Sequence, residues 1–280
     1  SSIRGVDGQF VTTLIAPTDR RFAASNLSGK LGIDHRLAGG ALLFASYSRG
    51  YRASGFNAQA YFNVAEVNVA KPEMLDAFEG GLKMRNADRS LSLSATGFTY
   101  AYRNQQFLSV NPANAEQTLV NLDASRIYGG ELELQLRLDP RLTLQTGLGL
   151  LHARATRGII SGQDVSGHHL SNAPSFTLSS SADLVAYDDG AQKLTLNANL
   201  SAVSSQYFEI LNIPRLRQAA YALLGARVDY RRGPWTVSLW GKNLTDKIYF
   251  TSRIDLSGFG FDYNHIGRPR SFGITAKYVY

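Results

Sequence analysis

Long segments of this chain alternate apolar and polar residues with a period of two, and this alternation constrains the fold more than any other feature. Between Leu142 and Leu150, leucine or threonine occupies one parity, and threonine, glutamine or glycine occupies the other. The same alternation recurs over 132–138, 194–200 and 272–280. Because side chains on a strand point alternately to its two faces, each stripe predicts a β-strand with one apolar face. The stripes run for about ten residues, longer than a typical soluble strand and similar to a tilted strand that spans a membrane.

Short turn-like clusters separate these strands in strict alternation with long irregular segments. The short clusters, rich in glycine, proline and aspartate, lie at 35–40, 85–89, 139–141, 188–192 and 231–234. The long segments lie at about 52–72, 104–124, 157–174, 208–219 and 249–269. Short turns at one end and long loops at the other are typical of an outer-membrane β-barrel.

A propeller is the alternative architecture, because successive turns are about 50 residues apart. Its glycine doublets would be Gly39-Gly40, Gly80-Gly81 and Gly129-Gly130, which are unequally spaced. Two tryptophans cannot supply one per blade, and each interval holds two long strands instead of four short ones. These features favour the barrel.

The pattern predicts eleven strands in an up-and-down antiparallel sheet. They are expected at about 25–34, 41–51, 73–84, 90–102, 125–138, 142–156, 175–186, 193–206, 220–230, 235–247 and 270–280. An odd number would leave the first and last strands parallel, whereas bacterial single-chain barrels have even numbers. We therefore expect either a portion of a larger barrel or closure by a route that the sequence does not reveal.

The composition excludes several other classes of protein. The chain has 280 residues, 44% of them hydrophobic, and no cysteine. Its mean hydropathy of −0.16 is too high for a disordered chain and too low for a bundle of membrane helices. The absence of cysteine excludes disulfide scaffolds, thiolate nucleophiles and zinc sites built on sulfur.

No enzyme, metal or nucleic-acid signature stands out. The sequence contains no GxSxG, phosphate-loop or HExxH motif, so we expect no catalytic residues and no cofactor. The adjacent His168 and His169 would point in opposite directions on an extended segment, which argues against a metal site. The net charge of +7 lacks a basic stripe with interleaved aromatic residues, so nucleic acid is not an expected partner.

Several spaced motifs give the chain a family resemblance. They are the segments 47–57 (YSRGYRASGFN), 72–73 with 78–83 (PE and FEGGLK), 128–133 (YGGELE), 243–249 (NLTDKIY) and 267–273 (GRPRSFG), followed by an aromatic last residue, Tyr280. From about residue 25 to its end, the chain resembles the TonB-dependent outer-membrane receptors, and within them the iron-siderophore receptors.

The resemblance implies an all-β transmembrane barrel of about 22 strands, of which this chain would hold the C-terminal half. We expect residues 1–24 to be a lead-in segment, residues 25–280 to be the barrel portion, and the plug domain to be absent from the sequence given. The resemblance also implies a multi-pass protein of the bacterial outer membrane, with membrane lipid, the barrel-assembly machinery and the TonB complex as partners. Contact with TonB would require a missing N-terminal part.

Parity assigns the strand residues to two faces. Lipid should meet Leu132, Leu134, Leu136, Leu194, Leu196, Leu200, Leu224, Ala226, Val228, Tyr230 and alternate residues from Phe272 to Tyr280. The lumen should receive Glu79, Lys83, Glu131, Glu133 and Arg227, together with Arg137, Asp183 and Lys277. These charges either form a salt-bridged wall against water or a plug, or contact a ligand directly.

Three aromatic and basic groups in the long loops are candidate ligand contacts. They are Arg49, Tyr51, Arg52, Phe56 and Asn57; then Tyr207, Phe208, Arg215 and Arg217; then Arg253, Tyr263 and His265. Aromatic rings and guanidinium groups suit planar catecholate-like or carboxylate-rich chelates. The alternative is an aromatic belt beneath solvated loops.

The last stripe, with Phe272, Ile274, Tyr278 and Tyr280, resembles the signal read by the barrel-assembly machinery, although these residues could equally be interface aromatics. The sequence thus predicts a receptor for TonB-dependent uptake of a ferric siderophore or a similar scarce chelate. The alternatives are a passive outer-membrane channel, a structural barrel, or uptake of a non-iron substrate such as cobalamin or an oligosaccharide.

Overall fold

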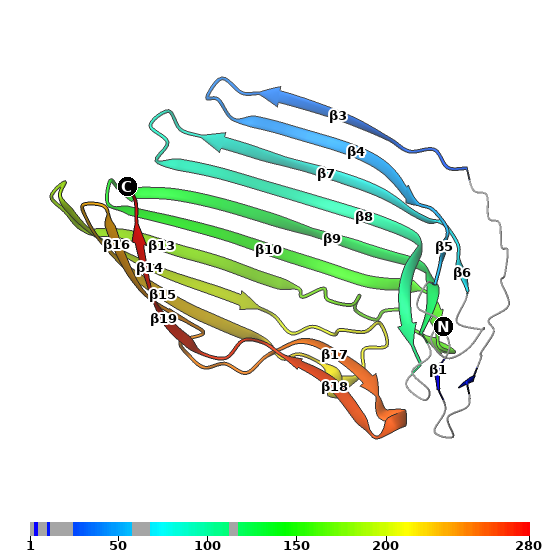
Figure 1. The fold of residues 1–280 in the computed structure, drawn as a ribbon. Coiled ribbons are helices and arrows are strands. Elements are labelled where there is room, and N and C mark those ends of the chain that lie inside the picture. The colour runs from blue at the N-terminus through cyan, green and yellow to red at the C-terminus, as the bar shows by residue number, and fades with distance from the viewer. Residues whose placement is uncertain (1–2, 5–9, 12–24, 58–67, 112–116) are drawn as a thin grey trace.

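Strands make up almost all of the regular structure in the computed structural model, which describes residues 3–4, 10–11, 25–57, 68–111 and 117–280 (Figure 1). The main sheet consists of β3 (Gly29–Arg36), β4 (Leu42–Arg52), β7 (Glu73–Arg85), β8 (Leu91–Val110), β9 (Gln117–Asp139), β10 (Leu142–Arg157), β13 (Phe176–Asp188), β14 (Gln192–Val203), β15 (Tyr221–Arg232), β16 (Trp235–Lys242) and β19 (Ser271–Tyr278).

The short elements lie outside this sheet. They are β1 (Ile3–Arg4), β2 (Phe10–Val11), β5 (Gly55–Phe56), β6 (Val69–Ala70), β11 (Ile159–Ile160), β12 (Gln163–Asp164), β17 (Phe250–Leu256), β18 (Phe261–Ile266) and the 3-10 turns η2 (Pro214–Leu216) and η3 (Ser257–Phe259).

The main sheet has eleven strands, each antiparallel to the one before it, as the alternation predicts. It curves into a trough in which β3 and β19 are the two edge strands (Figure 1). Within the described ranges, no helix is long and apolar enough to cross a membrane. The predicted all-β, up-and-down architecture is therefore confirmed.

The predicted short turns close the sheet at one end, at the left of Figure 1, and the longer connections lie at the other. Glycine occupies the left-handed positions that tight turns require, with φ of 81° at Gly40, 87° at Gly190 and 54° at Gly233. Aspartate side chains complete the turns: the Asp189 Oδ1 atom accepts hydrogen bonds from the backbone N–H groups of Ala191 (3.0 Å) and Gln192 (2.6 Å).

Two segments expected to be irregular are in fact strands. The expected loop 104–124 is largely a continuation of the β8–β9 ladder, which extends to the pair Val110 and Gln117; residues 112–116 lie outside the described part. The ladder passes an irregular position at Asn104, whose φ is 53°. The expected loop 249–269 contains the β17–β18 hairpin. Both predictions were wrong. In the β8–β9 extension, apolar residues such as Leu119 and Leu122 fall on both parities, so no alternation shows there. In the hairpin, alternation is present but runs for only six or seven residues on each strand.

Each side of the sheet has its own chemistry, because residues paired across strands share a face. Leu134 pairs with Leu93 and Thr146, whereas its neighbour Glu133 pairs with Ser94 and Gly147. We call the side of Leu134 the apolar face and the side of Glu133 the polar face. By the same pairings, the residues expected to face the lumen lie on the polar face: Glu79, Lys83, Glu131, Glu133 and Arg227.

Aromatic residues border the apolar face at both ends of the strands. Near the loop end the row Tyr47, Phe78, Thr99, Tyr128 and His152 crosses five adjacent strands. Near the turn end lie Tyr187, Tyr230, Trp235 and Tyr278. We call the first set the upper aromatic row and the second the lower aromatic row.

The length of the β9 segment that begins at the upper aromatic row fits a bilayer. On β9, Tyr128 and Leu138 are ten positions apart. At about 3.3 Å per residue and a tilt of about 40°, this separation amounts to roughly 25 Å along the membrane normal. Aromatic residues are enriched at both membrane–water interfaces. The apolar face therefore has the dimensions of a lipid-facing wall.

The facing of β9 can be tested by two adjacent substitutions. Leu134→Arg places a charge near the middle of the apolar face, at a cost of about 2–4 kcal/mol if lipid lies there. Glu133→Arg places the same charge on the polar face, where water can solvate it. We expect Leu134→Arg to reduce the amount of folded barrel in outer-membrane fractions, measured by heat-modifiable gel mobility, far more than Glu133→Arg. Equal losses would contradict the assignment of faces.

Candidate functional site

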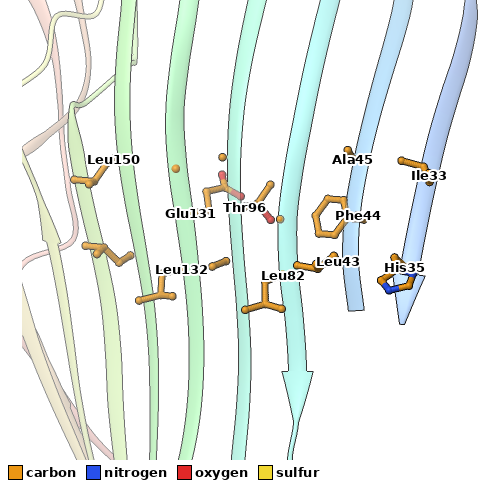
Figure 2. Close-up of a pocket in the computed structure, with 15 residues that line it drawn as sticks. Ile33, His35, Leu43, Phe44, Ala45, Leu82, Thr96, Glu131, Leu132 and Leu150 are labelled. Atoms are coloured by element: carbon orange, nitrogen blue, oxygen red, sulfur yellow. The ribbon is translucent and has the colours of Figure 1, made fainter. Parts of the chain in front are cut away.

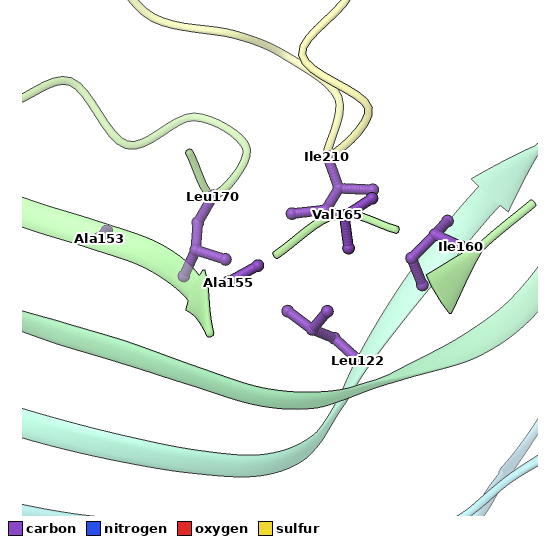
Figure 3. Close-up of a cluster of buried hydrophobic side chains, with 7 residues drawn as sticks. All are labelled: Leu122, Ala153, Ala155, Ile160, Val165, Leu170 and Ile210. Atoms are coloured by element: carbon purple, nitrogen blue, oxygen red, sulfur yellow. The ribbon is translucent and has the colours of Figure 1, made fainter. Parts of the chain in front are cut away.

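The long connections pack into an organised structure at the loop end of the sheet. Seven buried apolar residues form its core (Figure 3): Leu122, Ala153, Ala155, Ile160, Val165, Leu170 and Ile210. They come from β9, β10, the segment that follows β10, and the segment between β14 and β15. Leu122 and Val165 are completely buried. Segments distant in sequence are therefore held against the strands by a shared apolar core.

Polar contacts tie the same two segments together. The Nδ1 atom of His168 lies 3.0 Å from the carbonyl oxygen of Ile210, and the Asn172 N–H donates to the Tyr207 carbonyl at 2.8 Å. Asn212, at a φ of 54°, donates from Nδ2 to the His169 carbonyl at 2.9 Å. The segments 158–175 and 204–213 thus form one packed unit.

The connection between β4 and β7 is held in a different way, by side-chain amides. Gln106 donates from Nε2 to the carbonyls of Ala53 (2.9 Å) and Lys71 (3.0 Å), while its backbone N–H donates to Glu73 Oε2 at 2.8 Å. Asn121 adds a second bond to the Lys71 carbonyl at 3.0 Å. These side chains satisfy loop backbone groups that have no strand partner. The described parts of this loop are therefore docked on the β8–β9 extension.

Arg215 joins the segment between β14 and β15 to the β17–β18 hairpin. Its Nη2 atom donates to Asp255 Oδ1 and to Asp262 Oδ1 (3.2 Å), and its Nε atom donates to Asp262 Oδ2 (3.2 Å). The Asp255 side chain is only 7% exposed, so its charge depends on this guanidinium. Two further bonds join the same elements, from Arg253 Nη1 to the Arg217 carbonyl at 3.3 Å and from the Phe250 N–H to Gln218 Oε1 at 2.8 Å.

Burial and pairing shift the pKa values around this junction. Burial raises the pKa of Glu209, and the nearby Asp255 carboxylate adds to that effect, although the Asp255 N–H donates to Glu209 Oε1 at 3.2 Å. For Asp255 itself, burial acts upward, but hydrogen bonds from Ser257 and Arg215 outweigh it and lower the pKa. Hydrogen bonds to Asp262 and Asp255 raise the pKa of Arg215. Asp255 is therefore a well-paired carboxylate at this junction, and Glu209 beside it is a poorly paired one.

The first predicted contact group divides between the two faces. Arg49 and Tyr51 lie on the apolar-face parity, and Arg49 approaches Asp76 to 3.8 Å, whereas Arg52 lies on the polar-face parity. Phe56 is exposed on β5, and Asn57 is buried, with its amide donating to the Gln117 carbonyl. These five residues do not form one cluster.

The second and third groups come together through Arg215. Tyr207 lies 5.9 Å from the His169 ring, and Phe208 is half-buried next to it in the chain. Arg217 donates to Ser205 Oγ at 2.5 Å, and the Arg253 guanidinium lies 4.5 Å from the Phe250 ring. Tyr207, Phe208, Arg215, Arg217 and Arg253 therefore belong to a single loop junction.

Tyr263 and His265 lie on the other side of the hairpin from Arg253. Arg253 pairs with Asn264, and Ile254 pairs with Tyr263. Because successive side chains on a strand point to opposite faces, Arg253 and Tyr263 lie on opposite faces of the hairpin. Tyr263 is exposed, and His265 Nδ1 lies 3.1 Å from Thr251 Oγ1. The carboxylates Asp255 and Asp262 were missed, although a polar stripe with a spacing of two on each hairpin strand would have indicated them.

The polar face is a network of paired groups. The Tyr100 hydroxyl donates to Glu79 Oε1 at 2.7 Å, and Arg227 donates from Nε to Asp229 Oδ1 at 2.8 Å and from Nη2 to Ser238 Oγ at 2.9 Å. Lys83 lies 5.4 Å from the Phe44 ring centroid. These contacts resemble a structural polar wall more than a dedicated ligand site.

The apolar face carries a shallow groove across β3, β4, β7, β8, β9 and β10 (Figure 2). Its lining is mainly apolar and includes Ile33, Leu43, Leu82, Leu132 and Leu150, with His35, Thr96 and Glu131 as the polar members. The groove has the chemistry of an acyl-chain contact and lies apart from the loop junction.

Comparison with protein families and with known proteins identifies one family. The family model described as "TonB dependent receptor-like, beta-barrel" matches residues 2–244. The ferric-pyoverdine M114 receptor PbuA of Pseudomonas sp. (strain M114) is 26% identical over 232 residues, which are 79% of this chain and 26% of that receptor.

Solved structures share the fold. The ferric yersiniabactin uptake receptor FyuA from Yersinia pestis superposes with a TM-score of 0.75 at 20% identity, covering 90% of this chain and 37% of that one. The ferric-catecholate import receptor Fiu from E. coli K12 gives 0.68 at 21% identity, covering 90% and 34%. The copper transporter OprC gives 0.67 at 18% identity, covering 90% and 39%. The chain thus spans between a quarter and two-fifths of these relatives.

The loop junction predicts a shared effect of a single substitution. Arg215→Gln leaves the buried Asp255 carboxylate without its cation, so both partner segments should open together. We expect faster hydrogen exchange in 204–219 and in 250–266, measured on the protein produced from the complete gene. The control is Arg270→Gln, which removes an exposed pair with Asp246 at 3.5 Å and should leave both segments unchanged. A change confined to one segment would contradict the junction.

The raised pKa of Glu209 predicts that the packing of residues 205–213 depends on pH. Because its pKa is raised in the packed state, that state binds a proton more tightly than the open state does, and packing should strengthen as pH falls from neutrality towards about 5. Asp255 does not oppose this change, because its lowered pKa keeps it ionised in that range. His169, which contacts Tyr207 and Asn212, has a pKa lowered by burial and so weakens packing in both proteins as pH falls. We therefore expect protection of 205–213, after correction for intrinsic exchange rates, to change in favour of packing in the wild type relative to Glu209→Gln as pH falls over this range. The same pH dependence in both proteins would rule out Glu209 as its source.

Proposed function

Because the chain belongs to the TonB dependent receptor-like β-barrel family, we propose that it is the C-terminal part of a receptor that takes up a ferric siderophore or a similar scarce chelate by a TonB-dependent route. The family is an outer-membrane one, and this chain is an all-β outer-membrane barrel segment. Its curated relative and two of the solved structures above are named as receptors for ferric pyoverdine, ferric yersiniabactin and ferric catecholates.

The observation that carries this proposal is the loop junction at one end of a family barrel. Arg217 is exposed and Arg253 is half-exposed, and the Arg253 guanidinium is bonded to the Arg217 carbonyl. Tyr207 adds an aromatic ring to the same unit. Guanidinium groups and aromatic rings on a packed scaffold suit an anionic, planar chelate, because little ordering remains to be done on binding. In this proposal Arg215 positions the unit and does not itself contact the ligand.

Similarity to a copper transporter keeps a second substrate class open. The same loops could receive a metal complex that is not a ferric siderophore, or a non-iron substrate such as cobalamin or an oligosaccharide. A passive channel or structural barrel would need no ligand contacts at the loop end. Energy coupling through TonB, and closure of the barrel by further strands, remain part of the proposal, because they would depend on sequence beyond this chain.

The last strand supports a proposed contact with the barrel-assembly machinery. Phe272, Ile274 and Tyr278 all lie on the apolar-face parity of the edge strand β19, and Tyr280 follows it. Within the main sheet β19 is paired on one side only, so its other edge could pair with the assembly machinery before further strands close the barrel.

Growth and uptake assays test the proposed function. Deletion of the complete gene should abolish growth on one member of a panel of ferric chelates, and complementation should restore it. Arg217→Gln combined with Arg253→Gln should lower uptake of that chelate by at least about tenfold, since each charged hydrogen bond contributes about 1.5–3 kcal/mol.

Arg141→Gln combined with Arg232→Gln is the matched control, because it removes two exposed charges at the turn end of the barrel. That control should transport normally. Growth of the deletion strain on every chelate tested would count against siderophore uptake. A phenotype restricted to a non-iron substrate would favour the second substrate class.

A further inference from the structure

Two arginines stand directly opposite each other on the apolar face. Arg126 of β9 and Arg154 of β10 are cross-strand partners, so their Cβ atoms are about 4.5–5.5 Å apart. Like charges in this position are destabilising. The Arg126 side chain is exposed and makes no hydrogen bond or ion pair with any residue that the structure describes. The Arg154 side chain donates one hydrogen bond within the described part of the chain, from Nη1 to the Gly167 carbonyl at 2.7 Å.

The carboxylate on the same cross-strand row already has partners. The row that contains Arg126 continues through Ala101 to Asp76. Asp76 is engaged by Arg103 at 2.5 Å, Arg49 at 3.8 Å and the Tyr47 hydroxyl at 2.7 Å. It therefore balances other cations and leaves the Arg126–Arg154 pair uncompensated.

A histidine adjoins the pair on the β10 side. His169 pairs with Arg154 through an isolated backbone β-bridge and so lies on the same row. Burial lowers the pKa of His169, and the positive charge of Arg154 lowers it further, so the neutral form of this ring is favoured. The positive charge of this corner therefore comes from Arg126 and Arg154.

The position of the pair along the strands indicates what kind of anion it would meet. One step nearer the middle of the sheet lies the upper aromatic row, where the Tyr128 and His152 rings stack at 4.6 Å. One step further lie Gly130 and Leu150, which line the apolar groove (Figure 2). From the loop end towards the middle of the strands, the side chains on this face are therefore first cationic, then aromatic and then apolar.

We propose that Arg126 and Arg154 bind the phosphate group of a membrane lipid whose acyl chain lies in the groove below Tyr128 and His152. Phosphate oxygens accept bidentate hydrogen bonds from guanidinium groups, and one phosphate between two arginines removes their mutual repulsion. Interfacial aromatic rings lie at the level of lipid headgroups, which is the level this arrangement requires. A free anion would contact the arginines alone, whereas a lipid would contact the arginines, the aromatic rings and the apolar groove.

This site is distinct from the proposed ligand contacts, because Arg126 and Arg154 lie on β9 and β10, whereas Arg217 and Arg253 lie on the loop junction. Loss of lipid binding without loss of uptake, or the reverse, would separate the two proposals.

The experiment uses the protein from the complete gene, purified in dodecyl maltoside and titrated with lipid by native mass spectrometry. The probes are dioleoyl phosphatidic acid, dioleoylglycerol, which has the same chains without the phosphate, and inorganic phosphate. Arg126→Gln combined with Arg154→Gln should weaken phosphatidic acid binding by about tenfold or more, because each basic residue near a lipid surface contributes about 1 kcal/mol. Arg126→Lys combined with Arg154→Lys should retain much of the affinity.

The control is Arg85→Gln combined with Arg137→Gln, which removes two exposed charges from the polar face and should not change lipid binding. Unchanged affinity in the folded Arg126→Gln, Arg154→Gln protein would overturn the proposal. Displacement of phosphatidic acid by millimolar inorganic phosphate would assign the site to a free anion instead. If the glutamine variant does not assemble, the wild-type preference decides, and equal affinities for phosphatidic acid and dioleoylglycerol overturn the lipid assignment.

Discussion

Backbone hydrogen bonding is the constraint on which the rest of this structure depends. In a hydrocarbon environment each unpaired N–H or C=O group costs several kcal/mol, so every strand must pair along its length. Pairing fixes the register, and with a side-chain period of two the register fixes the face of every residue. A slip by one position would turn Glu131 and Glu133 towards the apolar face. Gly129 shows how closely the strands approach, because a Cβ atom there would overlap the carbonyl oxygen of Leu150.

The sequence predicted the membrane-spanning part of the fold well because two strong signals agree there. Apolar stripes such as 142–150 and 194–200 give both the strand and its apolar face, and turn residues such as Gly190 and Gly233 mark the ends. Beyond the upper aromatic row the signal weakens, because loop segments pack on the strands and apolar residues such as Leu119 and Leu122 fall on both parities. The alternation of β17 and β18 is short. The extension of β8 and β9 and the β17–β18 hairpin were therefore taken for loops.

The candidate site was predictable as a set of residue types but not as an arrangement. Arg215 and Asp255 are 40 positions apart, and nothing in either segment reveals that they meet. The loops are held by three kinds of interaction: an apolar core around Leu122, side-chain amides around Gln106, and the ion pairs of Arg215. Salt screens the Arg215 ion pairs but does not weaken the burial of apolar area. The segments held by Arg215 should therefore loosen more at high salt than the segments held by the apolar core around Leu122.

Parity and position along the strand together decide what each side chain meets. Along one parity of β9 the residues change from Leu132 through Gly130 and Tyr128 to Arg126, all on the same face. Parity alone would predict that all residues of such a series meet the same environment. Residue type alone led to the grouping of Arg49 with the ligand-contacting loops, although Arg49 shares a face with Leu43 and Tyr47. A basic residue at the edge of an apolar stripe is costly in the bilayer interior but favourable at the headgroup level. The arginines of this face are thus better explained by the depth at which they lie than by the loops that follow them.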